Sequence, residues 1–226
     1  VHFVNDTLGY LGGQFENMYQ TTDGGKTWTV AYTVNNSSSQ IFGIDFLDIN
    51  NGIAVGRSGE LVVTTDGGKT WKDNLSSAFK HLAVDYVNKD FIYSVGAGQV
   101  ASSMTSGTSW SAKSSVTYLG VSFVNDTLGF RVGSNGVCEK TIDGGTTWTK
   151  VDLNVTLALS DVDFTDAMHG YIVGYEGLVF ETKDAGKTWI KMDLGTTKNL
   201  YAIDFKGKTG YIVGQDGTVL TLGAKT

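Results

Sequence analysis

Three carboxylates lie in short polar turns between runs of apolar residues: Glu16, Glu176 and Asp216. Two acids held a suitable distance apart are all that glycoside hydrolysis requires, one as general acid and the other as base or nucleophile. Carboxylates are also common on any acidic protein, and this chain has a formal net charge of −6. We therefore predict no catalytic residues and keep a carboxylate-dependent glycoside hydrolase as the alternative hypothesis.

The sequence lacks the residue sets that other common sites need. Cys138 is the only cysteine, and His2, His81 and His169 fall at different positions of three sequence repeats, so no zinc-binding spacing exists. No nucleophile elbow, phosphate-binding glycine loop or H-E-x-x-H motif occurs. An acidic surface repels phosphate backbones, and no apolar run approaches the roughly 18 residues needed to span a bilayer. We predict no metal, no cofactor, no nucleic-acid partner and no membrane insertion.

Two repeated phrases indicate which elements position these residues. The first is TTDGGKTW at 21–28 and 64–71, TIDGGTTW at 141–148, TKDAGKTW at 182–189 and a degenerate SMTSGTSW at 103–110. The second is an apolar–polar–aromatic triplet followed by a polar turn and an apolar strand that begins with Gly. Its aromatic anchors are Phe3, Phe46, Tyr86, Phe123, Phe164 and Phe205.

Each repeat resolves into four short strands, A to D, separated by turn residues. In the second repeat we expect strand A at Ile41–Phe46, B at Gly52–Gly56, C at Glu60–Thr64 and D from Lys69–Trp71. Four strands per roughly 40 residues is the blade period of a β-propeller, whereas a β-sandwich has no fixed period. We predict an all-β fold, a propeller of six four-stranded blades in a single domain, 1–226. The expected blades are approximately 1–40, 41–80, 81–117, 118–158, 159–199 and 200–226.

The sixth repeat supplies only strands A, B and C, at Leu200–Phe205, Gly210–Gly214 and Thr218–Leu222. Residues 222–226 align with 66–70, one residue short of the tryptophan that would start strand D. The sequence starts within an inner strand, so we expect no upstream segment to supply the missing strand. The sixth blade should therefore lack its outer strand, and an unpaired edge is a template for association. We expect a neighbouring chain or residues of a longer parent to cover it; a seven-bladed parent that lost one blade is the alternative.

The phrase [ST]-x-D-x-G-x-T-W resembles the Asp box of the bacterial neuraminidase repeat families. These include sialidases, sortilin-type receptors, xyloglucan-cleaving glycosidases and photosystem II assembly-factor-like proteins. The last group resembles the chain most, because it also pairs a V-x-F … G-[YF]-x-V-G phrase with the Asp box. The resemblance implies the propeller fold but not one function. Sialidases of this kind clamp a substrate carboxylate with three arginines, and this chain has only Arg57 and Arg131.

The Asp box itself has a local, structural explanation. An Asp at a turn accepts hydrogen bonds from nearby backbone N–H groups, Gly tolerates positive φ, and Trp fills the space between sheets. Thr105 stands at the Asp position of the third repeat, so we expect that turn to be the loosest. The residues assigned to structural Asp boxes are Asp23, Trp28, Asp66, Trp71, Trp110, Asp143, Trp148, Asp184 and Trp189.

A second set of acids directly precedes the aromatic anchors of the inner strands: Asp45, Asp85, Asp163 and Asp204. Four carboxylates near a central channel would be able to gather a cation. We favour a structural role instead, in which each accepts backbone hydrogen bonds, because a buried carboxylate must be paired to be tolerated.

Strand alternation places the A–B and Asp-box turns on one face, and the B–C turns and D–A connections on the other. The second face varies between repeats, as ligand-binding loops on a rigid scaffold do. Its candidate ligand-binding residues are Phe15, Glu16, Arg57, His81, Tyr118, Asn135, Tyr175, Glu176, Tyr201 and Asp216. We expect a non-catalytic scaffold that binds a protein or glycan partner there, in a secreted, periplasmic or cell-surface protein.

Overall fold

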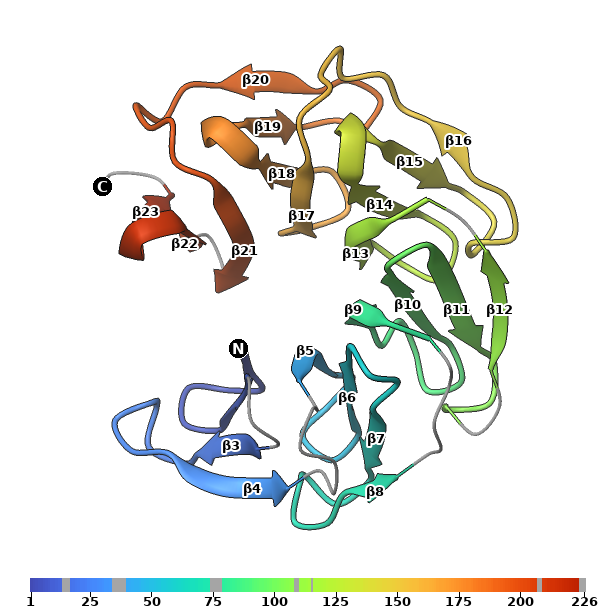
Figure 1. The fold of residues 1–226 in the computed structure, drawn as a ribbon, viewed down its shortest axis with the longest axis vertical. Helices are drawn as coiled ribbons and strands as arrows, with labels where there is room; N and C mark the ends of the chain where they lie inside the picture. Colours follow the sequence, from blue (N-terminus) through green and yellow to red (C-terminus); the bar gives the residue numbers. More distant parts are fainter. Residues whose placement is uncertain are drawn as a thin grey trace. The chain divides into compact units, whose positions relative to one another are not determined.

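The computed structural model describes residues 1–13, 17–33, 40–73, 79–107, 110–114, 116–206 and 209–223. Nearly all of their regular structure is antiparallel β-strand, arranged in separate sheets (Figure 1). The sheets are the blades of an all-β, six-bladed β-propeller, as predicted, and each blade has four strands except the last, which has three. The helices among these residues are three-residue 3-10 turns, so none is long and apolar enough to cross a membrane.

Residues Val1–Ser115 form a compact unit of three blades, called unit one below. Blade one comprises β1 (His2–Phe3), β2 (Gly9–Gly12), β3 (Asn17–Thr21) and β4 (Thr29–Thr33). Blade two comprises β5 (Ile41–Phe46), β6 (Gly52–Gly56), β7 (Leu61–Thr64) and β8 (Lys72–Asp73). Blade three comprises β9 (His81–Asp85), β10 (Ile92–Gly96), β11 (Gln99–Ser103) and β12 (Ser111–Ser114).

Residues Val116–Thr226 form unit two, with three further blades. Blade four comprises β13 (Tyr118–Phe123), β14 (Gly129–Gly133), β15 (Cys138–Thr141) and β16 (Thr149–Lys150). Blade five comprises β17 (Leu159–Phe164), β18 (Gly170–Gly174), β19 (Val179–Thr182) and β20 (Ile190–Met192). Blade six comprises β21 (Leu200–Lys206), β22 (Thr209–Gly214) and β23 (Val219–Leu222). The 3-10 turns η1 (Ser134–Gly136), η2 (Tyr175–Gly177) and η3 (Gln215–Gly217) join strands B and C of these blades.

The predicted strand bounds agree with the structure to within one residue, except at the start of one strand. Strands β5 and β6 have the bounds predicted from the sequence, but strand D of blade two begins at Lys72 and not at Lys69. The cause is the Asp box, because the Asp66 carboxylate accepts hydrogen bonds from the backbone and hydroxyl of Thr70 and holds residues 66–70 in the turn. Each sheet lies within one predicted blade range; the single domain over 1–226 stays a prediction.

Within each unit the aromatic anchors join neighbouring blades. In unit one the ring of Phe46 stacks on Tyr10 of blade one at 4.8 Å between ring centroids, and Trp71 packs edge-on against Tyr10 at 5.7 Å. In unit two Phe164 stacks in the same way on Phe130 of blade four at 4.9 Å. Buried aromatic pairs of this geometry stabilise a core beyond the apolar area that they bury. Phe46 and Phe164 therefore each pack their blade against the preceding one.

The register of blade six changes the alignment of its end. Gly210 of β22 pairs with Leu222, just as Gly170 of β18 pairs with Thr182 in blade five. Leu222 therefore corresponds to the threonine that opens the Asp box, and not to Asp66 as the sequence alignment assumed. The sheet of three strands, β21-β22-β23, is as predicted. Residues 224–226, on which the rest of that alignment depends, lie outside the described residues.

Candidate functional site

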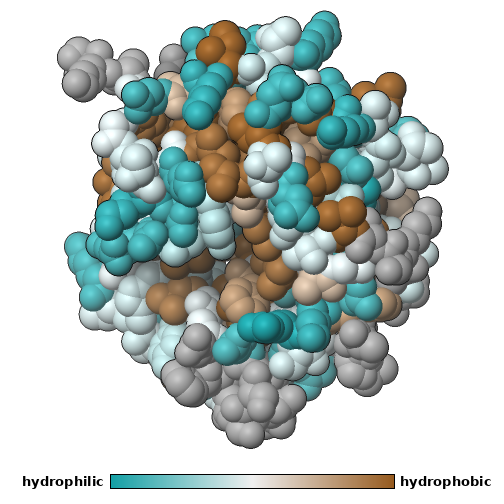
Figure 2. Space-filling view, turned by 45° about the horizontal axis from the view of Figure 1, so that its top comes forward, coloured by the Kyte–Doolittle hydropathy of each residue, from teal (hydrophilic) through white to brown (hydrophobic). Residues whose placement is uncertain are grey.

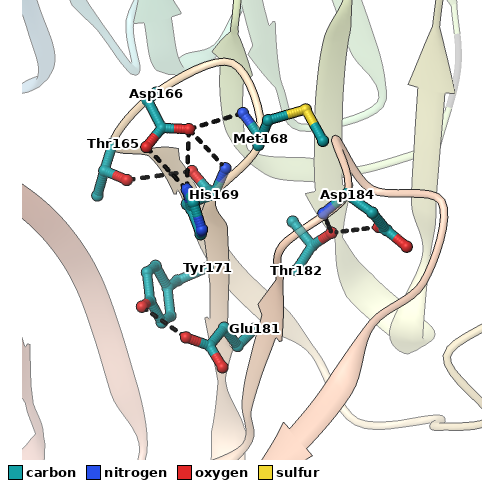
Figure 3. Close-up of polar contacts among 8 residues, drawn as sticks. All are labelled: Thr165, Asp166, Met168, His169, Tyr171, Glu181, Thr182 and Asp184. Atoms are coloured by element: carbon teal, nitrogen blue, oxygen red, sulfur yellow. Dashed lines mark hydrogen bonds and ion pairs between the residues drawn. The ribbon is translucent and has the colours of Figure 1, made fainter.

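The Asp boxes show which carboxylates are committed to turns. In blade five the Thr182 hydroxyl donates to Asp184 Oδ1 at 2.9 Å (Figure 3). The same hydroxyl accepts the backbone N–H of Gly186 at 2.9 Å. Asp184 also accepts the backbone N–H of Thr188 at 2.9 Å and its hydroxyl at 2.6 Å. The same contacts recur in the boxes of blades one, two and four. Each of these carboxylates therefore accepts hydrogen bonds within its own turn, from the threonine four residues further along the chain.

The pKa values of these carboxylates fall for the same reason. The threonine hydroxyl and then the backbone N–H groups lower the pKa of Asp23, Asp66 and Asp184 to about 2, and they lower the pKa of Asp143 as well. Hydrogen bonds donated to the charged form favour that form. Each of the four carboxylates is therefore ionised at neutral pH and is no general acid.

Blade three lacks the carboxylate of the box. The Ser103 hydroxyl still accepts the backbone N–H of Gly107 at 2.9 Å and that of Thr105 at 3.2 Å, and the Trp110 indole donates to the Gly107 carbonyl. Residues 108–109 lie outside the described residues. Ser103 thus keeps the first half of the turn, while Thr105 supplies a hydroxyl where the other boxes have a charge.

Hydrogen bonds between turns define the two faces within each blade. The Asp-box turn bonds to the A–B turn, as when Ala185 N donates to Met168 O at 3.0 Å. The B–C turn bonds to the start of strand A, as when Tyr175 N donates to Ala158 O at 2.9 Å. The sequence predicted these two groupings. The acid of the A–B turn, Asp166, is itself used by the turn, because it accepts the backbone N–H groups of Met168 and His169.

Most candidate ligand-binding residues are exposed on the B–C side of their blades. The exposed candidates are Arg57 in unit one and Asn135, Tyr175, Glu176, Tyr201 and Asp216 in unit two. Phe15 and Glu16 lie outside the described residues. In the space-filling view of Figure 2, hydrophobic residues lie among hydrophilic ones. Because single exposed apolar residues are normal, exposure alone does not define a site.

Two candidates are corrected, because His81 and Tyr118 are buried. His81 Nδ1 lies 2.7 Å from Ser94 Oγ, and burial lowers the pKa of the imidazole to about 4. The Tyr118 hydroxyl donates to Glu139 at 2.7 Å. Each is the first residue of an inner strand, a position that is also buried in β5, β17 and β21. Their side chains belong to the core and do not line the variable face.

Sequence reasoning missed Phe42, which is exposed at the second position of β5. Tyr201 occupies the same position in β21 and is also exposed. Successive side chains of a strand point to opposite sides, so the second residue is exposed where the first is buried. The signal that would have found Phe42 is its register relative to the aromatic anchor, four residues further on.

The inner-strand acids accept backbone hydrogen bonds where the structure shows their partners. Asp45 accepts the N–H of Phe46 at 2.9 Å and that of Tyr86, on the next blade, at 2.6 Å. Asp163 accepts the N–H of Phe164 at 2.8 Å. Among the described residues no group of three or more His, Cys, Asp or Glu side chains is placed to hold a metal ion.

A further acid, Asp161, was not singled out from the sequence. It accepts the N–H of Val162 at 2.9 Å and that of Ile203, on blade six, at 3.0 Å. Burial raises the pKa of this carboxyl to about 7, and the charges of Asp163 and Asp204 add to the rise. The corresponding residue is Gly43 in blade two, Gly120 in blade four and Ala202 in blade six. Asp161 therefore joins two blades through a carboxylate at a position where blades two, four and six have Gly or Ala.

Comparison with known proteins settles the family. Residues 1–73 and 145–224 match the family described as photosynthesis system II assembly factor YCF48, and together they cover about two thirds of the chain. The chain belongs to this YCF48 family. No curated protein matches the chain.

Solved structures show the fold. A YCF48 bound to a D1 peptide is 18% identical with a TM-score of 0.60, covering 99% of this chain and 92% of its own. YCF48 from Cyanidioschyzon merolae is 20% identical with a TM-score of 0.74, covering 96% of this chain and 77% of its own. An ancestral GH74 enzyme has a TM-score of 0.74 at 14% identity, and the match covers all of this chain but only 37% of that enzyme. At these identities the likeness concerns the fold alone.

Proposed function

We propose that this YCF48-family propeller is a non-catalytic scaffold that binds a protein partner through its B–C and D–A loops. The observation that carries the proposal is an exposed pair of tyrosines on this face of unit two. Tyr175 of blade five and Tyr201 of blade six are 38% and 48% exposed, and their rings meet edge to face at 6.4 Å. Tyrosine supplies a large contact area at a low cost in conformational entropy, and it is enriched at protein interfaces.

The loops around the tyrosines are held in place by polar contacts. Asn199 Oδ1 accepts the backbone N–H of Glu176 at 3.1 Å, which joins the connection before β21 to turn η2. Lys198 Nζ lies 2.6 Å from Asp216 Oδ2 and joins the same connection to turn η3. The surface is therefore ordered before a partner arrives, which reduces the entropy lost on binding. A YCF48 solved with a D1 peptide shows that a member of this family takes a polypeptide ligand.

The alternative hypothesis, a glycoside hydrolase on the same face, receives less support. Such an enzyme needs a general acid whose pKa is raised by an enclosed, apolar site. Glu176 and Asp216 are both exposed at turn tips, and Asp216 is paired with Lys198. Glu16, the third acid, lies outside the described residues. A glycan remains the second class of partner, to be tested together with the protein.

Substitution of the tyrosines tests this proposal. We expect Tyr175→Ala/Tyr201→Ala to lose the proteins that co-purify with the tagged wild-type chain from its source cells, with little change in melting temperature. Ile142→Ala is the matched control, because Ile142 is exposed on an Asp-box turn, on the opposite face of its blade. Retention of the partner by the double variant, or its loss in Ile142→Ala, would show that the wrong face was chosen. Glycan-array binding or glycosidase turnover by the wild type would favour the alternative.

The edge of blade six supports a second proposed contact. Strand β23 pairs with β22 and has no second strand partner among the described residues. We propose that a neighbouring chain or residues of a longer parent pair with this edge. If a second copy of this chain covers the edge, light scattering should show that the chain associates with itself. If residues of a longer parent cover it, the chain should bind a peptide made of those residues. Val219→Lys should reduce either association. A wild-type chain that stays monomeric and does not bind that peptide would contradict the proposal.

A further inference from the structure

Glu176 adopts a backbone conformation that its residue type disfavours. It lies in the left-handed region, with φ 55° and ψ 36°, at the centre of turn η2. Asn135 and Asp216 occupy the same position in η1 and η3 with φ 58° and 55°. Asn and Asp tolerate this region because their short side chains bond to the local backbone, whereas Glu lacks that compensation. Residues held in such conformations cluster at functional sites.

Three backbone hydrogen bonds fix the turn around this glutamate. Tyr175 N donates to Ala158 O at 2.9 Å, Glu176 N donates to Asn199 Oδ1 at 3.1 Å, and Gly177 N donates to Lys198 O at 2.9 Å. Three successive residues are thus tied to the preceding and following D–A connections. The base of the Glu176 side chain is therefore held, while its carboxylate is exposed to solvent.

The charges around the two exposed acids differ. Lys198 Nζ lies 2.6 Å from Asp216 and neutralises that carboxylate. The Glu176 carboxylate has no hydrogen bond or ion pair within the described part of the chain. The chain as a whole carries a formal charge of −6. The surface beside the tyrosine pair therefore presents one anion that is not balanced, and it favours a cationic ligand group.

The same chain already holds an arginine with this combination of groups. In blade four the Arg131 guanidinium carbon lies 4.2 Å from the ring centroids of both Tyr118 and Trp148. Its Nε donates to Glu139 Oε2 at 2.8 Å. Aromatic faces attract a guanidinium through the ring quadrupole, and a carboxylate binds its planar donors. Two aromatic rings and one glutamate thus contact an arginine side chain in this protein.

We propose that Tyr175, Glu176 and Tyr201 form a subsite for an arginine side chain of the protein partner. The guanidinium contacts the exposed tyrosine rings and donates hydrogen bonds to the Glu176 carboxylate. This inference rests on the proposed function and names the chemistry that the same face recognises. The partner segment therefore presents an arginine in an exposed, extended or loop conformation.

Two capped pentapeptides that differ by one group test the subsite. The probes are Ac-Gly-Ser-Arg-Ser-Gly-NH2 and the same peptide with citrulline, which keeps the shape of arginine and removes its charge. Titration followed by NMR should show wild-type protein binding the arginine peptide about ten-fold more tightly, equivalent to ~1.4 kcal/mol. Glu176→Gln should remove that preference, and Tyr201→Leu should weaken arginine binding several-fold. The preference should also fall when NaCl rises from about 50 to 500 mM.

Asp216→Asn is the matched control for the carboxylate. It makes the same kind of change at the equivalent turn position, where Asn135 shows that asparagine adopts the required conformation. This variant should keep the wild-type preference for arginine. Equal binding of the two peptides by the wild type, an arginine preference that survives Glu176→Gln, or its loss in Asp216→Asn would overturn the subsite.

These outcomes separate the subsite from the proposed function. If the tyrosine double variant loses the co-purified partner while the wild type does not distinguish the two peptides, the face binds a protein and the arginine subsite is wrong. If the wild type prefers arginine through Glu176 but the double variant retains the partner, the subsite exists and the proposed function of the face is wrong.

Discussion

Blades five and six have the same second strand, but the valines of their second and third strands differ in burial. Residues 170–174 read GYIVG and 210–214 read GYIVG, and a valine opens the third strand of each blade. Val173 and Val179 of blade five are fully buried, whereas Val213 and Val219 of blade six are 44% and 64% exposed. The difference comes from strand β21, because Leu200 and Ile203 pack on the blade-five valines. The corresponding valines are core or surface according to whether a strand of the next blade covers them.

The two blades also differ where their third strands end. Thr182 ends β19 and its hydroxyl opens an Asp box, whereas Leu222 ends β23 at the equivalent register position. Leu222 is buried in the cluster with Leu200 and Ile212. Blade five therefore closes its last turn with side-chain hydrogen bonds, and blade six ends its third strand with an apolar contact.

The sharpest test of the comparison is the same substitution in both blades. Val173→Asp should lower the free energy of unfolding by about 3 kcal/mol or more, because it buries an unpaired polar group. Val213→Asp should change it by about 0.5 kcal/mol or less, because the side chain stays in water. Urea unfolding of the two variants measures both values. A large loss in Val213→Asp would mean that this face of blade six is covered in solution.

The next effect concerns the third position of the inner strands, which is Asp161 in blade five and Ala202 in blade six. The folded-state pKa of Asp161, about 7, lies above the ordinary value of 3.8. Its contribution to stability is therefore fully present below about pH 4 and is lost as the pH rises through 7. Asp161→Ala should remove about 3 kcal/mol of this pH dependence, measured by denaturant unfolding between pH 4.5 and 8. A variant with the wild-type slope would show that another group titrates.

The Asp box of blade five should contribute less, and its pH dependence should have the opposite sign. Because hydrogen bonds lower the pKa of Asp184 to about 2, its stabilisation is present above about pH 4 and is lost as the pH falls toward 2. Asp184→Asn should lower the melting temperature at pH 7 by about 5 °C and reduce the acid sensitivity between pH 4 and 2. Thr105→Ala, at the box position of blade three that has no carboxylate, should change neither quantity appreciably.

The smallest effect is expected from the exposed ion pair of blade six. Lys198 and Asp216 are 2.6 Å apart, but about half of each side chain is exposed. Pairs of this kind contribute little because water screens the charges and two mobile side chains must be fixed. Lys198→Met should therefore change the free energy of unfolding by about 0.5 kcal/mol or less. A larger change that disappears in 1 M NaCl would show that the pair organises the loop.

Local chemistry explains why the fold could be predicted from the sequence. The Asp box is complete within about eight residues, because each carboxylate bonds four residues ahead to its own turn. Gly, Asn and Asp end the strands at these turns whatever surrounds them. The repeat therefore predicted six blades, the bounds of β5 and β6 and the three strands of blade six. It also predicted the grouping of the turns on two sides of each blade.

Only the tertiary structure decided which residues of the variable face are available. His81 and Tyr201 both stand near the start of an inner strand, but a shift of one position buries the first and exposes the second. Asp161 accepts a hydrogen bond from Ile203, a residue of another blade, so no local pattern marks it. The turns are determined by residues that are neighbours along the chain, and these can be read directly from the sequence. Burial follows from neighbours in space, because residues 170–174 and 210–214 have the same sequence although their valines differ in burial.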